Sequence, residues 1–280
     1  MSVKLSHKKN QNGTHPLFKT TNGEGVGGKL YGNIKVTIGA QGVRFLLQLG
    51  ITIVMARLLV PSDFGLIAMT AALVNLITVI KDAGLVQATI QQDTILEEQI
   101  SSIFWINAMI SILLAAIAAG CGPFIAWLYG DDRLVLIAIA LSIPIMVSGF
   151  GLQHRALLQR NMKFIDIAII DISAQVVGAI FAILSALSGA GYWSLIIMQT
   201  VSSLVTVTFL WNRSAWKPQR MALSKGVGGM LKFGADISGA NILNYLARNT
   251  DNFLIGKFIG AEALGFYDRA YSLVRAPIRQ

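Results

Sequence analysis

The stretch GAQGVRFLLQLGITIVMARLLVPSDFGLIAMTAALV, residues 39–74, contains two apolar runs joined by the short turn VPSD at 60–63. An α-helix that crosses about 30 Å of hydrocarbon needs about 20 predominantly apolar residues. The runs at 36–59 and 64–80 are both close to this length. They therefore predict two consecutive membrane-spanning helices.

The same pattern extends over most of the chain. Hydrophobic residues make up 54% of the 280 residues and charged residues only 13%, about half of the roughly 25% usual in soluble domains. Further apolar segments lie at 103–128, 134–152, 165–187, 192–211 and 236–259, separated by polar connections and by turns such as GDDR at 130–133. The sequence predicts an all-α polytopic membrane protein with seven spans in an up-and-down bundle.

Basic residues are distributed unequally between the two sides of such a bundle. With a cytoplasmic N-terminus, only Arg57, Arg133 and Lys257 lie on the outer side. The tail and the longer connections hold fifteen basic residues: Lys4, Lys8, Lys9, Lys19, Lys29, Lys35, Lys81, Arg155, Arg160, Lys163, Arg213, Lys217, Arg220, Lys225 and Lys232. This asymmetry predicts the orientation and accounts for most of the net charge of +9, so no nucleic-acid partner is expected.

An internal repeat appears when the chain is shifted by 200 residues without a gap. Residues 39–74 then align with GANILNYLARNTDNFLIGKFIGAEALGFYDRAYSLV at 239–274, with six identities in 36 positions, among them Gly65 with Gly265. Both copies enter the membrane in the same direction because six spans separate their starts. This is the parallel-repeat arrangement of two-lobed transporters.

The repeat divides the chain into four predicted parts. Residues 1–33 form a flexible cytoplasmic tail, 34–212 a six-helix lobe, and 213–232 a basic cytoplasmic linker. Residues 233–280 hold span seven and an eighth span that starts near Leu264 and is incomplete. We therefore expect a truncated form of a two-lobed protein with twelve or more spans, inactive in transport by itself.

Two arginines lie within predicted spans, Arg44 in the first and Arg248 in the seventh. An arginine at mid-bilayer costs roughly 2.5 to 3.5 kcal/mol on insertion scales, so such residues usually face a bundle interior or a wet cavity. In the aligned repeats they differ by four positions, one helical turn, so they predict a shared cavity in which two guanidiniums could bind a phosphate. For Arg248 the alternative is a local ion pair with Asp251 at i+3.

Other polar residues in the spans are candidates for the same cavity. Asn244 precedes Arg248 by one turn, and Asp171 and Gln175 lie one turn apart in the fifth span. The last two are predicted either to line the cavity or to form a polar contact between helices. The candidate substrate-binding residues are Arg44, Asp171, Gln175, Asn244, Arg248 and Asp251.

Enzymatic functions are disfavoured by the residue pattern. His7, His15 and His154 are scattered and Cys121 is the only cysteine. The sequence has no HExxH motif, no GxxxxGK[ST] phosphate loop and no external loop large enough for a catalytic domain. We expect neither catalysis nor a metal or cofactor.

Several stretches resemble the polysaccharide-transporter branch of the multidrug/oligosaccharidyl-lipid/polysaccharide flippase superfamily, in particular exporters of the O-antigen and colanic-acid type. They are ARLLVPSDFGLIAM at 56–69, DAGLVQATIQ at 82–91, HRALLQRNMKF at 154–164, GAGYWSL at 189–195 and NYLARNTDNFLIGKFIGAEALGFYDRAY at 244–271. The resemblance implies a multi-pass protein of the bacterial inner membrane with two six-helix lobes. It also implies alternating-access export of undecaprenyl-pyrophosphate-linked oligosaccharides, a cationic cavity, and contacts with membrane lipid and with polysaccharide polymerase or export machinery.

Two alternative functions remain. A cation-coupled drug exporter of the same superfamily would favour acidic over basic residues in the cavity, whereas the intramembrane charges here are mainly basic. The other alternative is a non-transporting membrane scaffold or a remnant, which the incomplete eighth span favours.

Overall fold

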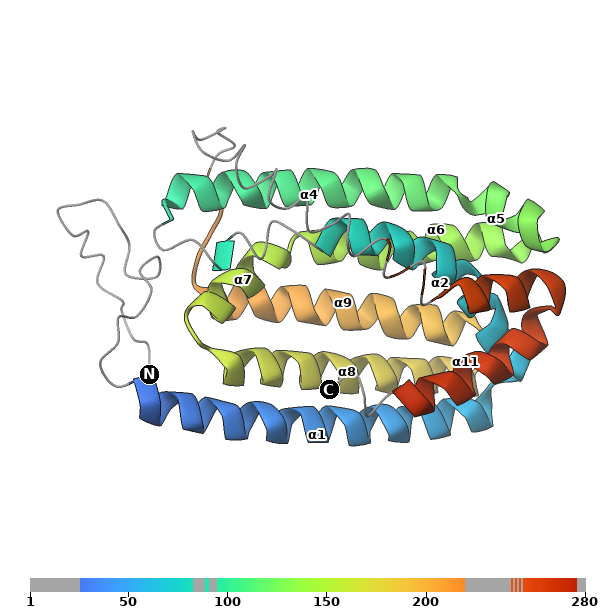
Figure 1. Cartoon of the computed structure of the whole chain (residues 1–280), viewed down its shortest axis with the longest axis horizontal. Helices are drawn as coiled ribbons and strands as arrows, with labels where there is room; N and C mark the ends of the chain where they lie inside the picture. Colours follow the sequence, from blue (N-terminus) through green and yellow to red (C-terminus); the bar gives the residue numbers. More distant parts are fainter. Residues whose placement is uncertain are drawn as a thin grey trace.

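The computed structural model describes residues 26–82, 89–90, 95–219, 243, 245, 247 and 249–275. In this part of the chain the regular structure is helical, and no strand occurs. The named helices are α1 (Val26–Leu58), α2 (Pro61–Asp82), α4 (Glu97–Gly120), α5 (Gly122–Tyr129), α6 (Arg133–Gly149), α7 (Leu152–Arg160), α8 (Phe164–Leu187), α9 (Trp193–Ser214) and α11 (Ala261–Arg275). Figure 1 shows the longest of them lying side by side, and the predicted all-α fold is confirmed.

Five segments of the described chain are long and apolar enough to cross a membrane, and a bent pair of helices adds a sixth. The five are Gly39–Leu58, Pro61–Thr78, Glu97–Tyr129, Phe164–Leu187 and Trp193–Ser214, and each overlaps a predicted span. The protein is therefore a multi-pass membrane protein. Of the predicted seventh span, only 249–258 is described as a continuous helix, so that span stays a prediction.

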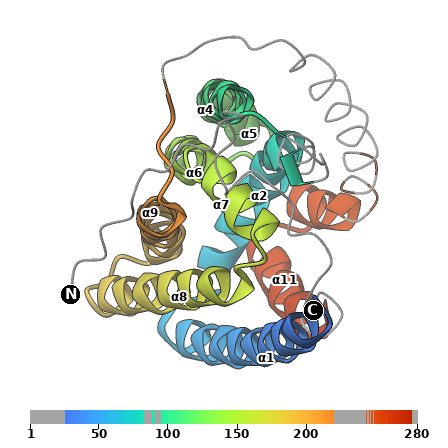
Figure 2. The same cartoon turned by 90° about the vertical axis from the view of Figure 1, so that its left-hand side faces the viewer.

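The fourth span and the connection after it differ from the sequence prediction. The predicted spans at 134–152 and 165–187 leave residues 153–164 as a polar connection, but α7 occupies most of this connection and meets α6 at a bend of 42°. Figures 1 and 2 place α7 at the end of the bundle where α8 begins. Three of its polar residues, Gln153, His154 and Arg160, are buried and have partners in other segments. The Nε2 of Gln153 donates to the Thr89 hydroxyl, and Arg160 donates to the Thr89 carbonyl.

The first helix also begins earlier than its apolar run. Helix α1 starts at Val26, within the segment predicted as a tail, whereas the membrane-compatible part starts at Gly39. Hydropathy identifies the part of a helix that is apolar enough to lie in the bilayer. It does not mark where helical hydrogen bonding begins, so the two boundaries need not coincide.

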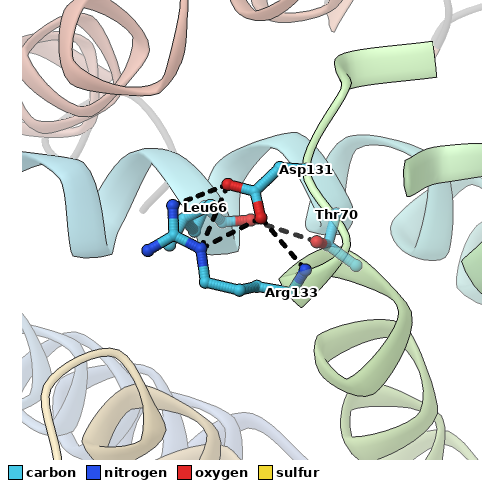
Figure 3. A network of polar contacts seen from close by, with 4 residues as sticks. All are labelled: Leu66, Thr70, Asp131 and Arg133. Atoms are coloured by element: carbon cyan, nitrogen blue, oxygen red, sulfur yellow. Dashed lines mark hydrogen bonds and ion pairs between the residues drawn. The ribbon is translucent and has the colours of Figure 1, made fainter. Parts of the chain in front are cut away.

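A polar turn closes the bundle at the end where α5 meets α6. Gly130 ends α5 with a left-handed φ of 73°, as expected for a glycine after a helix. The Arg133 guanidinium then binds Asp131 at 2.6 Å and lowers the pKa of that carboxyl below its usual value (Figure 3). Figure 3 also shows α2, where the Thr70 hydroxyl donates to the Leu66 carbonyl. The turn predicted at 130–133 is therefore present.

Helices α2 and α11 pack closely through two glycines that the repeat aligns with each other. A Cβ atom on Gly65 would lie 1.7 Å from the carbonyl oxygen of Ala261, and one on Gly265 would lie 2.0 Å from that of Pro61. Pro61 and Ala261 are themselves 200 residues apart. The glycine of each copy thus contacts, in the other copy, the residue that the repeat aligns with Pro61 or Ala261. Such reciprocal contacts are expected of two units related by a two-fold axis.

Candidate functional site

A cavity of about 1070 Å³ lies among α1, α2, α6, α8, α9, α11 and the 249–258 helix. This volume is slightly above the usual range for small-molecule sites, roughly 300 to 1000 Å³. Its wall includes the predicted residues Arg44, Asp171 and Gln175. The cavity therefore contains many polar groups although helices of membrane-spanning composition form it.

One carboxylate in this wall binds two guanidiniums. Asp171 on α8 accepts a hydrogen bond of 3.0 Å from Nη1 of Arg44 on α1. It also accepts two from Arg155 on α7, at 2.9 Å and 2.7 Å. The Asp171 side chain is only 9% exposed, so this pairing compensates much of the cost of burying its charge.

A second polar contact lies one turn further along the same two helices. The side-chain Nε2 of Gln175 donates to Oε1 of Gln48 at 2.8 Å. Both residues are four positions beyond the Arg44–Asp171 pair, so α1 and α8 run in the same direction. The sequence left open whether Asp171 and Gln175 line the cavity or join helices, and in the structure they do both.

Arg155 was not identified as a site residue from the sequence, where it was counted with the basic residues of a cytoplasmic connection. The burial of the neighbouring Ala156, Leu157 and Leu158 shows that this segment packs as a helix. That apolar run between charged residues is the signal that could have revealed it. Arg155 is not among the described residues that line the cavity, so it reaches Asp171 from another side.

The predicted residues of the second repeat have different outcomes. Asn244 and Arg248 lie outside the described residues, so their places in the cavity stay predictions. Asp251 is described but is not among the lining residues; its Oδ2 accepts a hydrogen bond of 2.5 Å from the Tyr267 hydroxyl. Its predicted partner Arg248 lies outside the described residues, so this pairing stays a prediction.

Other residues of the second repeat line the cavity and were missed. Tyr245, Asn249 and Asn252 come from one helical segment, and Asp268 and Tyr271 come from α11. The spacing 245, 249 and 252 follows one face of a helix, and this periodicity could have identified the group. The asparagines and tyrosines supply amide and hydroxyl groups, which both donate and accept hydrogen bonds, whereas Asp268 supplies a carboxylate, which accepts them.

Comparisons with known proteins agree on the protein's family. Residues 54–280 match the family model described as "Polysaccharide biosynthesis protein". The chain is 30% identical to the teichuronic acid biosynthesis protein TuaB of Bacillus subtilis (strain 168), over 71% of this chain and 42% of that protein. It is 28% identical to the succinoglycan biosynthesis transport protein ExoT of Rhizobium meliloti (strain 1021), over 80% and 45%.

A third relative is the lipopolysaccharide biosynthesis protein WzxC of Escherichia coli (strain K12), 26% identical over 80% of this chain and 46% of that protein. The chain thus spans less than half the length of each of these three relatives. No solved structure gives a significant match. Because the family model covers most of the chain, this membrane protein belongs to the polysaccharide biosynthesis protein family, as its resemblance to polysaccharide transporters predicted.

Proposed function

We propose that this chain belongs to a flippase that moves undecaprenyl-pyrophosphate-linked oligosaccharides across the bacterial inner membrane for polysaccharide or lipopolysaccharide synthesis. The observation that carries the proposal is a large polar cavity inside a membrane bundle, with the Arg44 guanidinium in its wall. The names of ExoT and WzxC, a biosynthesis transport protein and a lipopolysaccharide biosynthesis protein, support a role in this process.

The chemistry of the cavity suits an anionic, sugar-bearing lipid. Arg44 is 45% exposed and donates to Asp171 through Nη1, so its other N–H groups are available to a phosphate. The side-chain amides of Asn249 and Asn252 in the 249–258 helix and the Tyr271 hydroxyl of α11 suit the hydroxyl groups of a glycan. Arg248 is proposed to contribute a second guanidinium, with Asn244 and Asp251 near it.

Cation-coupled export of drugs is the second candidate, and the described carboxylates of the cavity disfavour it. Asp171 is paired with two arginines, and Asp268 accepts a hydrogen bond of 2.8 Å from Arg269. A cationic drug would have to displace an arginine from either carboxylate. An anionic substrate would instead meet the exposed part of Arg44.

The substrate is tested by replacing Arg44 in the native protein of the host. Arg44→Lys should reduce polysaccharide export per unit of inserted protein by roughly tenfold, because an ammonium cannot reproduce the two-pronged contact of a guanidinium with phosphate. Arg57→Lys is the matched control, since Arg57 is exposed and is not among the described lining residues. Normal export by Arg44→Ala at normal abundance would overturn the phosphate-binding role.

The proposed orientation, with a cytoplasmic N-terminus, is tested by labelling single cysteines after Cys121 is replaced by alanine. Cysteines at Ser62 and Ser188 should react with a membrane-impermeant thiol reagent added to intact cells. Cysteines at Gln159 and Ser224 should react only after the cells are permeabilised. The fifteen-to-three charge asymmetry is the physical reason, and the reverse labelling pattern would contradict it.

A further inference from the structure

We infer that Arg155 is a positioning residue in the ion-pair cluster formed by Arg44, Asp171 and Arg155. It neutralises Asp171 from outside the cavity, so that the positive charge of Arg44 stays available inside the cavity. This inference rests on the proposed function, because it concerns how the cavity attracts a phosphate-bearing lipid. Arg44 and Asp171 alone form a neutral pair, whereas Arg44, Asp171 and Arg155 together carry one net positive charge.

The hydrogen bonds identify Arg155 as the main partner of the carboxylate. Its Nη1 binds Oδ1 of Asp171 and its Nη2 binds Oδ2, so both oxygens are engaged by one planar guanidinium. Arg44 makes one longer contact, from Nη1 to Oδ2. Bidentate hydrogen bonds between a guanidinium and a carboxylate, such as those of Arg155, are strong and fix the relative orientation of the two groups. Asp171 is thus held by Arg155 even when Arg44 turns toward a ligand.

Position and exposure separate the roles of the two arginines. Arg44 lines the cavity and its side chain is 45% exposed, whereas Arg155 is 32% exposed and is not among the described lining residues. A ligand in the cavity therefore meets Arg44 and not Arg155. The net positive charge of the three residues therefore faces the cavity as the guanidinium of Arg44.

Arg155 can do this because α7 is fixed on its other faces. The neighbouring His154 is fully buried, and its Nδ1 lies 2.7 Å from the Ser214 hydroxyl at the end of α9. Arg160 at the far end of α7 donates to the Thr89 carbonyl at 2.9 Å. These contacts attach α7 to two distant segments, so the Arg155 guanidinium is directed at Asp171 by a rigid element.

A structural role for Arg155, as a clamp between α7 and α8, makes a different prediction. A clamp is lost whenever either partner is removed, so removing both cannot restore function. Charge neutralisation predicts rescue instead. Arg155→Ala leaves Asp171 to neutralise Arg44, and adding Asp171→Asn removes the acid and frees Arg44 again.

The test uses purified full chain in detergent with geranylgeranyl diphosphate, a polyprenyl diphosphate without sugar, as the probe. Arg155→Ala should weaken binding by roughly tenfold, the effect of losing one charge-assisted interaction. Arg155→Ala/Asp171→Asn should bind within roughly threefold of the unmodified protein, and Arg155→Lys should retain intermediate binding because it keeps the charge but not the paired contact. Arg44→Ala/Asp171→Asn carries the same net charge as the rescued variant but lacks the cavity arginine, so it should bind weakly.

The outcomes separate this inference from the proposed function. If the unmodified protein does not bind the diphosphate, the phosphate-lipid proposal fails. If it binds but the Arg155→Ala/Asp171→Asn variant is as weak as Arg155→Ala, while thermal unfolding shows both variants folded, Arg155 is only a clamp. Equal binding by Arg155→Ala and the unmodified protein would also overturn the positioning role.

Discussion

Replacing Gly65 with alanine is expected to destabilise the protein by about 3 kcal/mol or more, the upper part of the range for overpacked sites. The new Cβ would lie 1.7 Å from the carbonyl oxygen of Ala261 and 2.4 Å from its carbonyl carbon. These are backbone atoms, so no side-chain rotation can relieve the overlap, and α2 and α11 would have to separate. Thermal unfolding in detergent measures the effect.

The reciprocal substitution and a matched control sharpen this prediction. Gly265→Ala should have a similar effect, because its Cβ would lie 2.0 Å from the carbonyl oxygen of Pro61. Gly50→Ala makes the same chemical change in α1, where a Cβ meets no atom within 4 Å. That control should be neutral or stabilising by up to about 1 kcal/mol, since alanine favours helix over glycine. Equal unfolding temperatures for Gly65→Ala and Gly50→Ala would show that the helices do not cross at these glycines.

Replacing Phe104 with alanine is expected to cost roughly 3 kcal/mol, at the lower end of the range for buried Phe→Ala because neighbouring lipid reduces the gain from burial. Phe104 on α4 is 1% exposed and is surrounded by other rings. Its centroid lies 5.4 to 6.4 Å from those of Trp105, Phe150, His154, Trp211 and Trp216, each in an edge-on arrangement. Truncation would leave a void where α4, α7 and the end of α9 meet.

The control for this prediction is Phe124→Ala in α5, because the Phe124 ring is 53% exposed. Its loss should change the unfolding temperature little. The Phe104 variant should also unfold more readily near Trp211 and Trp216, which tryptophan fluorescence reports. An unfolding curve for Phe104→Ala that coincides with that of Phe124→Ala would mean that the aromatic cluster does not hold these helices together.

The sequence predicted the spans well because the bilayer imposes one dominant requirement, a long apolar helix. The segment 165–187 matches Phe164–Leu187 almost residue for residue, and 192–211 closely matches Trp193–Ser214. The turn at Gly130 was also predicted, since glycine tolerates the left-handed backbone that ends a helix. Arg44, Asp171 and Gln175 were identified as intramembrane polar residues, which are expensive unless they have partners.

The partners of these residues depended on the fold. Arg44 and Asp171 are 127 residues apart, and neither hydropathy nor local spacing indicates that they form an ion pair. The sequence paired Arg44 with Arg248 across the repeat, and Arg248 lies outside the described residues. Six identities alone give weak support for the internal repeat. The reciprocal contacts of Gly65 and Gly265 between α2 and α11 support it independently.

By itself, the sequence determined the helical membrane architecture and the protein's family, because apolar length and characteristic motifs are properties of contiguous residues. Only the tertiary structure decided that Arg155 forms an ion-pair cluster with Asp171 and Arg44. That assignment requires the 42° bend between α6 and α7, the anchoring of α7 to other segments, and the position of Asp171 on α8. The electrostatic potential at a bound ligand depends on the charges of all the side chains near it. Residues from α1, α7 and α8 become neighbours only when the helices pack.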